Sequence, residues 1–323
     1  MNLNQILEQL NNHNGINPKP DDYDDYWKRA KAEMKAVESN VEITKAKFES
    51  PIVNCYDMYF TGVNGARIYS KLLKPKTITG SCPAVIAFHG YNSKSPAWTE
   101  LLPYAASGFV VAALDCRGQA GKSEDIGGHK GKTIRGHIIR DLEEHPDKLL
   151  IRDIFLDAAQ LAGIVMDMEE VDENRVGVFG GSQGGALSIA CAALEQRVKQ
   201  AAPRLPFLCD IRYSYENGAA QNGYPYEELL TYFRENDPRH EREEEIFTKL
   251  GYIDVQFLAP KVKAEVLMFC SLKDPFCPPP TQYLAYNNMI CDKNILVYPD
   301  YGHEPLIDAS ELTYQFMMKL LDN

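Results

Sequence analysis

The stretch RVGVFGGSQGGALSIAC, Arg175–Cys191, decides the fold. Its first residues form a short apolar run rich in valine, which predicts a buried strand, and its last residues are apolar and predict a helix. Between the two, four glycines surround a single serine, Ser182. A serine at a sharp turn from strand to helix presents its hydroxyl to a cleft, and glycines beside it leave room for that turn. The stretch therefore predicts a nucleophile elbow with Ser182 at its tip.

Two nucleotide-binding motifs compete with this interpretation, and neither fits. The dinucleotide fingerprint G-x-G-x-x-G also joins a strand to a helix, but the glycine spacing of Gly180–Gly184 does not match it. The segment Gly121-Lys122-Ser123 resembles the end of a phosphate-binding loop. The first glycine of that motif would stand at position 116, which is Cys116, and no apolar helix follows. We therefore expect no nucleotide and no other cofactor.

Composition excludes further classes of partner. With 45% hydrophobic and 24% charged residues, the 323-residue chain has the composition of a soluble globular protein. A net charge of −11 argues against nucleic acid and against anionic membranes as partners. There is no apolar run of about 18 residues that could span a membrane. The N-terminal residues lack the basic start and apolar core of a secretory signal.

The cysteines and histidines do not suggest a metal or disulfide framework. The eight cysteines are scattered without a C-x-x-C pair, so we expect free thiols in a reduced, cytoplasmic protein. Three histidines stand eight residues apart in a glycine-rich connection: His129, His137 and His145. This spacing is not typical of metal ligands, and we expect no metal site.

The rest of the chain predicts an α/β fold. Asn-Gly at 64–65, between alternating segments at 56–61 and 66–73, predicts an antiparallel hairpin. Compact apolar strands then alternate with helices. The strands are expected at 84–88, 109–114, 175–179, 265–270 and 294–298, and the helices at 21–37, 97–107, 150–168, 184–195, 279–289 and 308–321. This alternation indicates a mostly parallel central sheet with helices on both faces, which together with the elbow predicts an α/β-hydrolase fold.

We expect one domain, 1–323, because no linker divides the chain. Residues 1–50 form an N-terminal extension. Two long connections interrupt the alternation of strands and helices. The first, 117–148, is rich in glycine and charge and is expected to line the site. The second, 210–255, is highly charged, contains helical stretches and follows the elbow, so we expect a helical insertion there.

An elbow serine needs a histidine base, and the base needs an acid to orient it. In this fold the three follow in the order serine, acid, histidine. Two histidines follow Ser182, and His240 lies in the charge run PRHEREEE, where we expect a solvated face. His303 lies between the strand at 294–298 and the last helix, so it is the predicted base.

Asp274 is the predicted acid. It follows the strand at 265–270 in the loop LKDPFCPPP, at the end of the sheet where the serine also lies. Asp300 and Asp254 are its rivals. Asp300 stands only three residues before His303 on the same connection, which gives it a poor reach to the imidazole.

The oxyanion hole of this fold takes one backbone N–H from the residue after the nucleophile, here Gln183. The second N–H comes from an early junction of strand and loop, and AFHGYN at 87–92 provides one. We expect the backbone N–H of Tyr91 to serve, so its side chain need not take part. The alternative is that His89-Gly90 only turns the chain.

Several separate motifs agree with one family. They are Arg117-Gly118-Gln119, Gly180-Gly181-Ser182-Gln183-Gly184 and His303-Glu304, together with Asp274–Pro279 (DPFCPP), HGYN at 89–92 and PFLCD at 206–210. Over nearly its whole length the chain resembles the acetyl xylan esterases and cephalosporin C deacetylases, a carbohydrate-esterase branch of the α/β-hydrolases. The residues that follow Gln119 depart from the family pattern, so the resemblance does not determine the residues of the substrate-facing wall.

The resemblance implies that Ser182, Asp274 and His303 form the triad and that Tyr91 and Gln183 form the oxyanion hole. It implies a serine esterase that removes acetyl groups, by way of an acyl-serine, from small substrates such as acetylated xylo-oligosaccharides or cephalosporin C. It also implies a homo-oligomer, a ring-shaped hexamer. The other motif positions, Arg117, Gly118, Gln119 and Glu304, are expected near the site, with a salt bridge or hydrogen bond as the role of Arg117 and Gln119.

Two alternatives remain open on the residues. One is a general short-chain carboxylesterase or a peptidase of the same fold. The other is a hydrolase-fold binding protein without catalysis, which we would expect to lack a triad member; this chain has all three. The sequence does not identify the natural acetylated compound.

Overall fold

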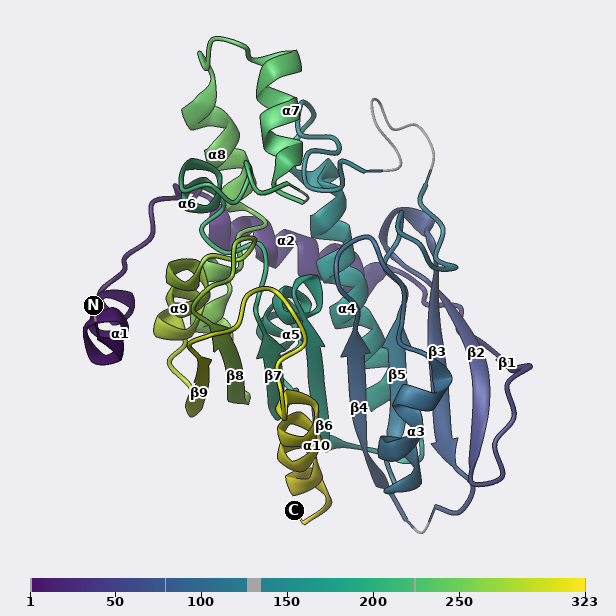
Figure 1. Ribbon diagram of the computed structural model, residues 1–323. Coiled ribbons are helices and arrows are strands. Elements are labelled where there is room, and N and C mark those ends of the chain that lie inside the picture. The colour runs from purple at the N-terminus through teal and green to yellow at the C-terminus, as the bar shows by residue number, and fades with distance from the viewer. Residues whose placement is uncertain (1, 79, 127–134, 224, 323) are drawn as a thin grey trace.

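A nine-stranded sheet runs through the middle of the computed structural model, which describes residues 2–78, 80–126, 135–223 and 225–322 (Figure 1). The strand order is β1-β2-β3-β5-β4-β6-β7-β8-β9. The antiparallel part contains β1 (Glu42–Lys45), β2 (Val53–Thr61) and β3 (Arg67–Pro75), which pairs with β5. The parallel part contains β4 (Cys82–Phe88), β5 (Val110–Leu114), β6 (Val171–Gly181), β7 (Gln200–Arg204), β8 (Glu265–Ser271) and β9 (Lys293–Tyr298).

Helices cover both faces of this sheet, as β4 shows. Ala84 and Ile86 face one apolar cluster, and Val85 and Ala87 face another, because successive residues of a strand point to opposite sides. The first cluster is shared with α2 (Tyr23–Ala36), α4 (Leu150–Met166), α5 (Gln183–Leu194) and α9 (Pro279–Asn288). The second is shared with α3 (Trp98–Ala106) and α10 (Ala309–Met318). The predicted α/β-hydrolase architecture is confirmed.

The predicted hairpin is also present. Strands β2 and β3 pair from Val53↔Pro75 to Thr61↔Arg67, and the turn between them holds Asn64 at φ 61° and Gly65 at φ 80°. Asparagine and glycine adopt this left-handed conformation more easily than other residues, which explains why Asn-Gly marks the turn.

Three elements were missed by the sequence analysis. Strand β7 reads QAAPR, which offers two alanines and a proline instead of a β-branched run, yet it is buried between β6 and β8. Strand β1 is fully exposed at the edge of the sheet and shows no apolar alternation. Helix α1 (Leu3–Asn11) buries only Leu10 and packs beside α9. In each case contacts with neighbouring elements, rather than the element's own residues, stabilise it.

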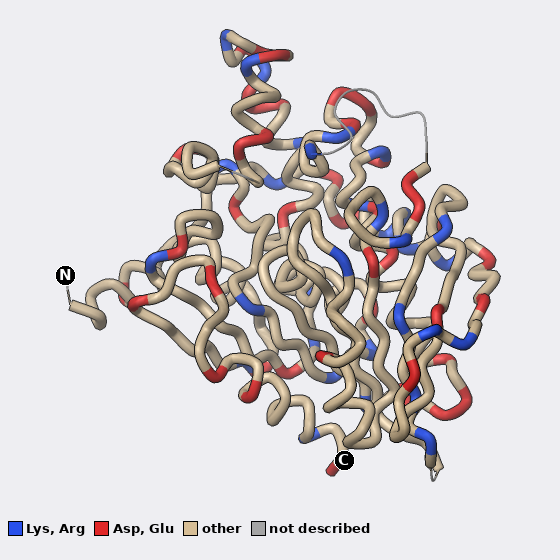
Figure 2. The backbone as a smooth tube through the Cα atoms, turned by 45° about the vertical axis from the view of Figure 1, so that its right-hand side comes forward, with Lys and Arg blue, Asp and Glu red and all other residues tan. Residues whose placement is uncertain are grey.

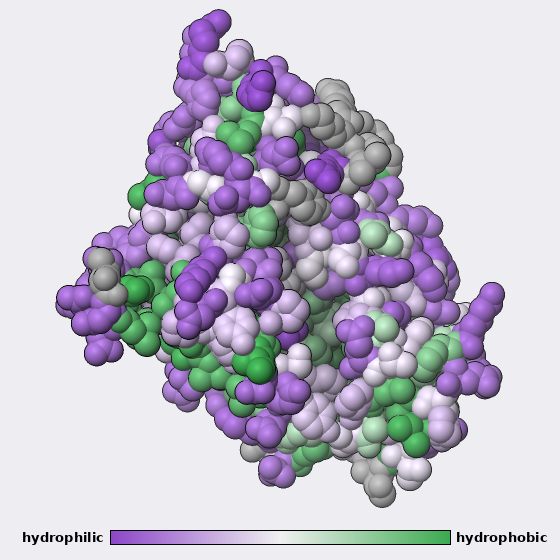
Figure 3. Space-filling model, in the orientation of Figure 1, coloured by the Kyte–Doolittle hydropathy of each residue, from purple (hydrophilic) through white to green (hydrophobic). Residues whose placement is uncertain are grey.

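The insertion between β7 and β8 is helical, as expected. It contains α6 (Ile211–Glu216), α7 (Glu227–Asn236) and α8 (Glu243–Gly251), which stand above the carboxyl ends of the parallel strands (Figure 1). Acidic and basic residues follow each other along this part of the chain (Figure 2), and its outer surface is mostly hydrophilic (Figure 3). The insertion therefore lies over the edge of the sheet where the predicted site residues end their strands.

No helix among the described residues is long and apolar enough to cross a membrane.

Candidate active site

Ser182 forms the turn between β6 and α5 and has φ 57° and ψ −117°, a backbone conformation that residues with a side chain rarely adopt. The end of β7 and the residues just after it hold Ser182 there. The Ser182 N–H donates to the carbonyl oxygen of Arg204 at 2.9 Å, and the Phe207 N–H donates to the Ser182 carbonyl oxygen at 3.1 Å. A Cβ at Gly180 or Gly184 would lie 2.5 or 2.3 Å from the carbonyl oxygen of Phe88. These glycines let the elbow approach β4, which places the serine at the end of the sheet.

The predicted base and acid are in contact. His303 Nδ1 lies 2.7 Å from Asp274 Oδ2, and the Asp274 side chain is fully buried. The other carboxylate oxygen accepts the backbone N–H groups of Phe276 at 2.9 Å and Cys277 at 2.8 Å. The Gln282 amide donates to Oδ2 at 3.3 Å. These donors fix the direction of the carboxylate, which in turn can hold the histidine ring with its hydrogen on Nδ1.

Cys277 connects this pair with the nucleophile. Its thiol lies close enough to the Ser182 side chain for that side chain to oppose the rise that burial causes in the pKa of the thiol. A carboxylate oxygen of Asp274, the sulfur of Cys277 and a ring nitrogen of His303 all lie within 4.8 Å of one another. Burial raises the pKa of the Cys277 thiol well above its usual value, so the thiol stays neutral beside the hydroxyl. Cys277 was not among the predicted site residues, and its place within DPFCPP is the only signal for it in the sequence.

The residues that competed with the predicted triad lie elsewhere. Asp300 pairs with Lys273 at 2.7 Å, and its side chain is 84% exposed. Asp254 is buried and accepts the backbone N–H groups of Asp210 and Ile211 at 3.0 Å. His240 lies 2.8 Å from a carboxylate oxygen of Glu243 on the insertion. The structure therefore brings Asp274 to His303 and gives each rival another partner.

Gln119 links the two loops that contain the predicted oxyanion-hole residues. Its side-chain oxygen accepts the N–H of Asn92, the residue after Tyr91, at 2.7 Å. Its side-chain nitrogen donates to the side-chain oxygen of Gln183 at 2.7 Å. Gln183 is fully buried, whereas Asn92 and Gln119 are partly exposed, so both hydrogen bonds lie at the edge of the interior. The expectation of a hydrogen bond for Gln119 is confirmed.

The turn at His89-Gly90 also shapes this loop. His89 Nε2 accepts the N–H of Cys116 at 3.0 Å, and Nδ1 lies 2.7 Å from the carbonyl oxygen of Gly90. These two contacts fit a neutral ring with its hydrogen on Nδ1. Burial lowers the pKa of His89, which agrees with that state. The dipeptide turns the chain, and by doing so it leads into Tyr91.

Arg117 forms the expected salt bridge, and it is buried. Its Nε and Nη2 donate to the two oxygens of Asp157 at 2.7 and 2.6 Å, and Nη1 donates to Asp153 at 3.1 Å. Nη1 also lies 3.3 Å from the carbonyl oxygen of Val63 in the hairpin turn. Burial raises the pKa of Asp157 to about 6, and the neighbouring guanidinium opposes that rise. Arg117 thus ties the loop after β5 to α4 and to the β2–β3 turn.

The two remaining motif residues support the loops around the site. Gly118 has φ 68°, and a Cβ there would lie 2.9 Å from the carboxylate of Asp125. Glu304 is exposed and accepts the N–H of Gly302 at 3.1 Å, which braces the turn that carries His303. Gly118 and Glu304 therefore shape the loops beside the site.

The three evenly spaced histidines do not form a cluster in the described chain. His129 lies outside the described residues. His137 is buried, with Nε2 3.3 Å from the side-chain oxygen of Asn92, and burial lowers its pKa to about 4. His145 is exposed, and its ring lies 3.2 Å from the carboxylate of Asp147.

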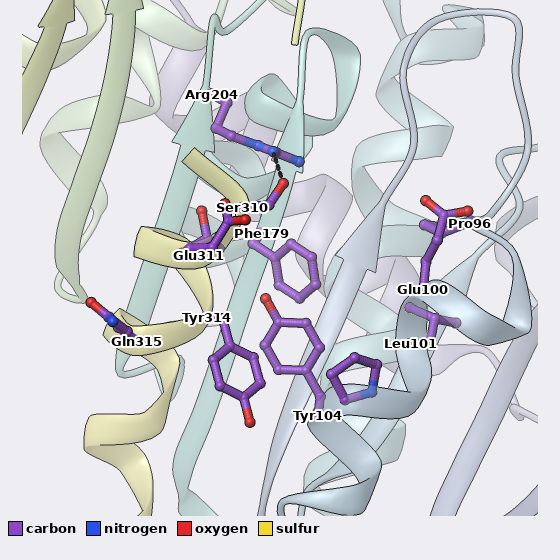
Figure 4. Close-up of a pocket in the computed structure, with 12 residues that line it drawn as sticks. Pro96, Glu100, Leu101, Tyr104, Phe179, Arg204, Ser310, Glu311, Tyr314 and Gln315 are labelled. Atoms are coloured by element: carbon purple, nitrogen blue, oxygen red, sulfur yellow. Dashed lines mark hydrogen bonds between the residues drawn. The ribbon is translucent and has the colours of Figure 1, made fainter. Parts of the chain in front are cut away.

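A pocket of about 570 Å³ between α3 and α10 is separate from the triad (Figure 4). Tyr104, Phe179 and Tyr314 form its aromatic part, and Arg204 donates to Ser310 at 3.3 Å. The lining residues are Pro96, Glu100, Leu101, Pro103, Tyr104, Phe179, Arg204, Ser310, Glu311, Thr313, Tyr314 and Gln315. None of them is a predicted catalytic residue, although the backbone of Arg204 supports the elbow.

The parallel sheet, the elbow serine and the Asp274–His303 pair together define an α/β-hydrolase. Within that class the chain belongs to the acetyl xylan esterase (AXE1) family, whose sequence model matches residues 1–320. The resemblance noted from the motifs is thereby confirmed, and the chain is a carboxylic ester hydrolase by family.

Similar proteins of known structure or curated sequence agree with this assignment. Acetyl xylan esterase 1 from Thermoanaerobacterium sp. JW/SL YS485 is 52% identical with a TM-score of 0.94, and the match covers 99% of each chain. The acetyl xylan esterase from Paenibacillus sp. R4 is 33% identical with a TM-score of 0.91, again over 99% of each chain. The acetyl esterase Axe7A of Xylanibacter ruminicola is 26% identical over 309 residues, 93% of this chain. This chain spans 66% of the length of that relative.

Asp274→Asn tests the geometry of the pair. We expect kcat for p-nitrophenyl acetate to fall by about 10⁴-fold, because an amide no longer holds the histidine in the tautomer with its hydrogen on Nδ1. Asp300→Asn is the control and should change kcat by less than about twofold, since Asp300 contacts Lys273 at the surface. A larger loss in Asp300→Asn than in Asp274→Asn would assign the acid to Asp300.

Proposed function

We propose that this chain is a serine esterase that removes acetyl groups from small oxygen esters, with Ser182 as nucleophile, His303 as base and Asp274 as the orienting acid. The observation that carries the proposal is the 2.7 Å contact between His303 Nδ1 and Asp274 Oδ2. The Asp274–His303 pair lies near Ser182 in its strained turn, and Cys277 lies close to both the pair and the serine. Strained residues of this kind cluster at functional sites.

The reaction follows from these positions. His303 Nε2 takes the proton of the Ser182 hydroxyl as its oxygen attacks the ester carbonyl. The N–H groups of Gln183 and Tyr91 stabilise the negative charge that develops on the carbonyl oxygen. The alcohol leaves with the proton from His303, and an acetyl-serine remains. The same histidine then activates a water molecule, which releases acetate and restores the serine.

The family and its members favour acetylated xylo-oligosaccharides as substrates, because two of the similar proteins are named acetyl xylan esterases. Cephalosporin C is a second candidate from the motif resemblance. The net charge of −11 favours neutral sugars over polyanions as substrates. The other candidate function is a general short-chain carboxylesterase or a peptidase of the same fold, which acyl-chain selectivity and amide substrates would reveal.

We also propose a cytoplasmic homo-oligomer, most simply the hexamer that the resemblance implies. All eight cysteines are free, and only Cys291 is more than slightly accessible, which fits a reducing compartment.

Ser182→Ala is the direct test of the proposed nucleophile. The variant should fold normally and lose several orders of magnitude in kcat for p-nitrophenyl acetate, since the acyl-serine can no longer form. Circular dichroism and the melting temperature serve as the folding control. Retention of more than about a tenth of wild-type activity would refute the assignment of Ser182.

Acyl-chain selectivity tests the proposed substrate class. The site has bulky neighbours: Phe207 hydrogen-bonds to the Ser182 backbone, and the ring of Phe276 lies 5.6 Å from that of His303. Each added methylene must displace packed side chains at about 1–3 kcal/mol, or roughly fivefold in kcat/KM at the low end, and the butyrate has two more methylenes than the acetate. p-Nitrophenyl acetate should therefore exceed the butyrate by at least about tenfold after correction for intrinsic reactivity, with the octanoate nearly inert. A flat or rising profile would favour the general carboxylesterase.

A further inference from the structure

Glu228, on α7 of the helical insertion, is a buried carboxylate that reaches the oxyanion loop. Its residue is 6% exposed. Oε1 accepts the phenol O–H of Tyr91 at 2.6 Å and the backbone N–H of Gly136 at 2.8 Å, and Oε2 accepts the backbone N–H of Ile138 at 3.0 Å. The oxyanion-hole role expected for Tyr91 needs only its backbone N–H, and its side chain bonds to Glu228 instead.

The electrostatics of Glu228 are unusual for a buried carboxylate. In the described part of the chain, no side-chain cation lies within 4.0 Å of it, in contrast to the aspartates that face Arg117. Burial raises the pKa of Glu228, and the hydrogen bonds from Tyr91 and the backbone at 136–138 oppose that rise. A buried charge is costly unless polar groups surround it, and hydrogen bonds to a charged acceptor are among the stronger ones. The three donors therefore belong to one tightly held unit.

That unit contains the residue proposed to stabilise the oxyanion. Besides its bond to Glu228, the Tyr91 phenol oxygen accepts the backbone N–H of His137 at 3.0 Å. The Tyr91 ring also contacts the ring of Phe207, with 5.5 Å between centroids. The following residue, Asn92, is held from the other side by Gln119. The Tyr91 backbone thus lies between two anchors, one on the loop after β5 and one on the insertion.

We propose that Glu228 is a positioning residue, which through the phenol of Tyr91 orients the Tyr91 N–H toward the oxygen of the tetrahedral intermediate. The inference rests on the proposed function, in which that N–H is an oxyanion donor. It gives the insertion a part in catalysis: α7 sets the alignment of a group that acts on the reacting atoms. A misplacement of about 1 Å can lower the rate on the order of a hundredfold. A buried group that fixes this alignment therefore favours catalysis.

The experiment compares Glu228→Gln, Tyr91→Phe and the double variant with wild type. The amide keeps one acceptor oxygen but turns an NH2 group toward a backbone N–H, and the phenylalanine keeps the ring while it removes the hydroxyl. Glu227→Gln, at an exposed position of the same helix, is the matched control. The measurements are kcat and KM for p-nitrophenyl acetate and the inhibition constant of methylboronic acid, whose adduct with the serine places an oxygen in the oxyanion hole.

We expect each single variant to lower kcat by about tenfold or more with little change in KM, and to weaken methylboronic acid by a similar factor. The double variant should have a kcat no lower than that of the more impaired single variant, because both substitutions break the same hydrogen bond between Tyr91 and Glu228. Glu227→Gln should match wild type. Independent effects that multiply in the double variant, or a change in KM alone, would overturn the role of Glu228.

The controls separate this inference from the proposed function. If wild type and Glu227→Gln neither hydrolyse the ester nor bind methylboronic acid, the proposed function fails. If both are active and Glu228→Gln is equally active, only the role of Glu228 fails. Should Glu228→Gln not fold, Tyr91→Phe alone decides the question, since it preserves the ring and removes only the hydroxyl, which bonds to Glu228 and to the His137 N–H; unchanged kcat in that variant would refute the proposal.

Discussion

The strained turn at Ser182 is the constraint on which the rest of the site depends. A residue with a side chain in this conformation costs about 1–3 kcal/mol and persists only when its surroundings leave no alternative. Here the neighbouring strands provide that restraint: the turn hydrogen-bonds to Arg204 on β7, and its flanking glycines lie against Phe88 on β4. The apolar faces of the sheet hold those strands in place, so the packing of the whole α/β core supports one serine.

Around this turn, the loops at the carboxyl ends of the strands are fixed by buried polar groups. Two of these groups are charged, and the free-energy cost of burying each charge is offset in a different way. Arg117 is neutralised by two aspartates and ties its loop to α4, whereas Glu228 is surrounded by N–H and O–H donors and ties the insertion to Tyr91. Gln119 joins the two predicted oxyanion loops without any charge. The reacting groups are therefore held by a polar network that the apolar core alone could not orient.

The sequence predicted those parts of the molecule that short stretches of chain determine. The apolar strands and the Gly-rich elbow are local patterns, and the order serine, acid, histidine together with the positions of the loops after the strands favoured Asp274 and His303 as partners. Strand β7 was missed because its burial depends on β6 and β8 rather than on its own residues. Glu228 could not be found in the sequence, since nothing distinguishes it from the exposed Glu227 beside it until α7 packs against the oxyanion loop. The contact between Cys277 and Ser182 likewise joins residues far apart in the chain.

Labelling with a fluorophosphonate probe, followed by peptide mapping, tests the central claim most directly. The probe reacts with a serine only when a base removes its proton and an oxyanion hole receives the phosphoryl oxygen, so it reports the assembled site rather than one residue. We predict one equivalent of probe per chain, attached to Ser182, with loss of ester hydrolysis in proportion to labelling. Attachment at another residue, or an active protein that leaves Ser182 unlabelled, would contradict the account.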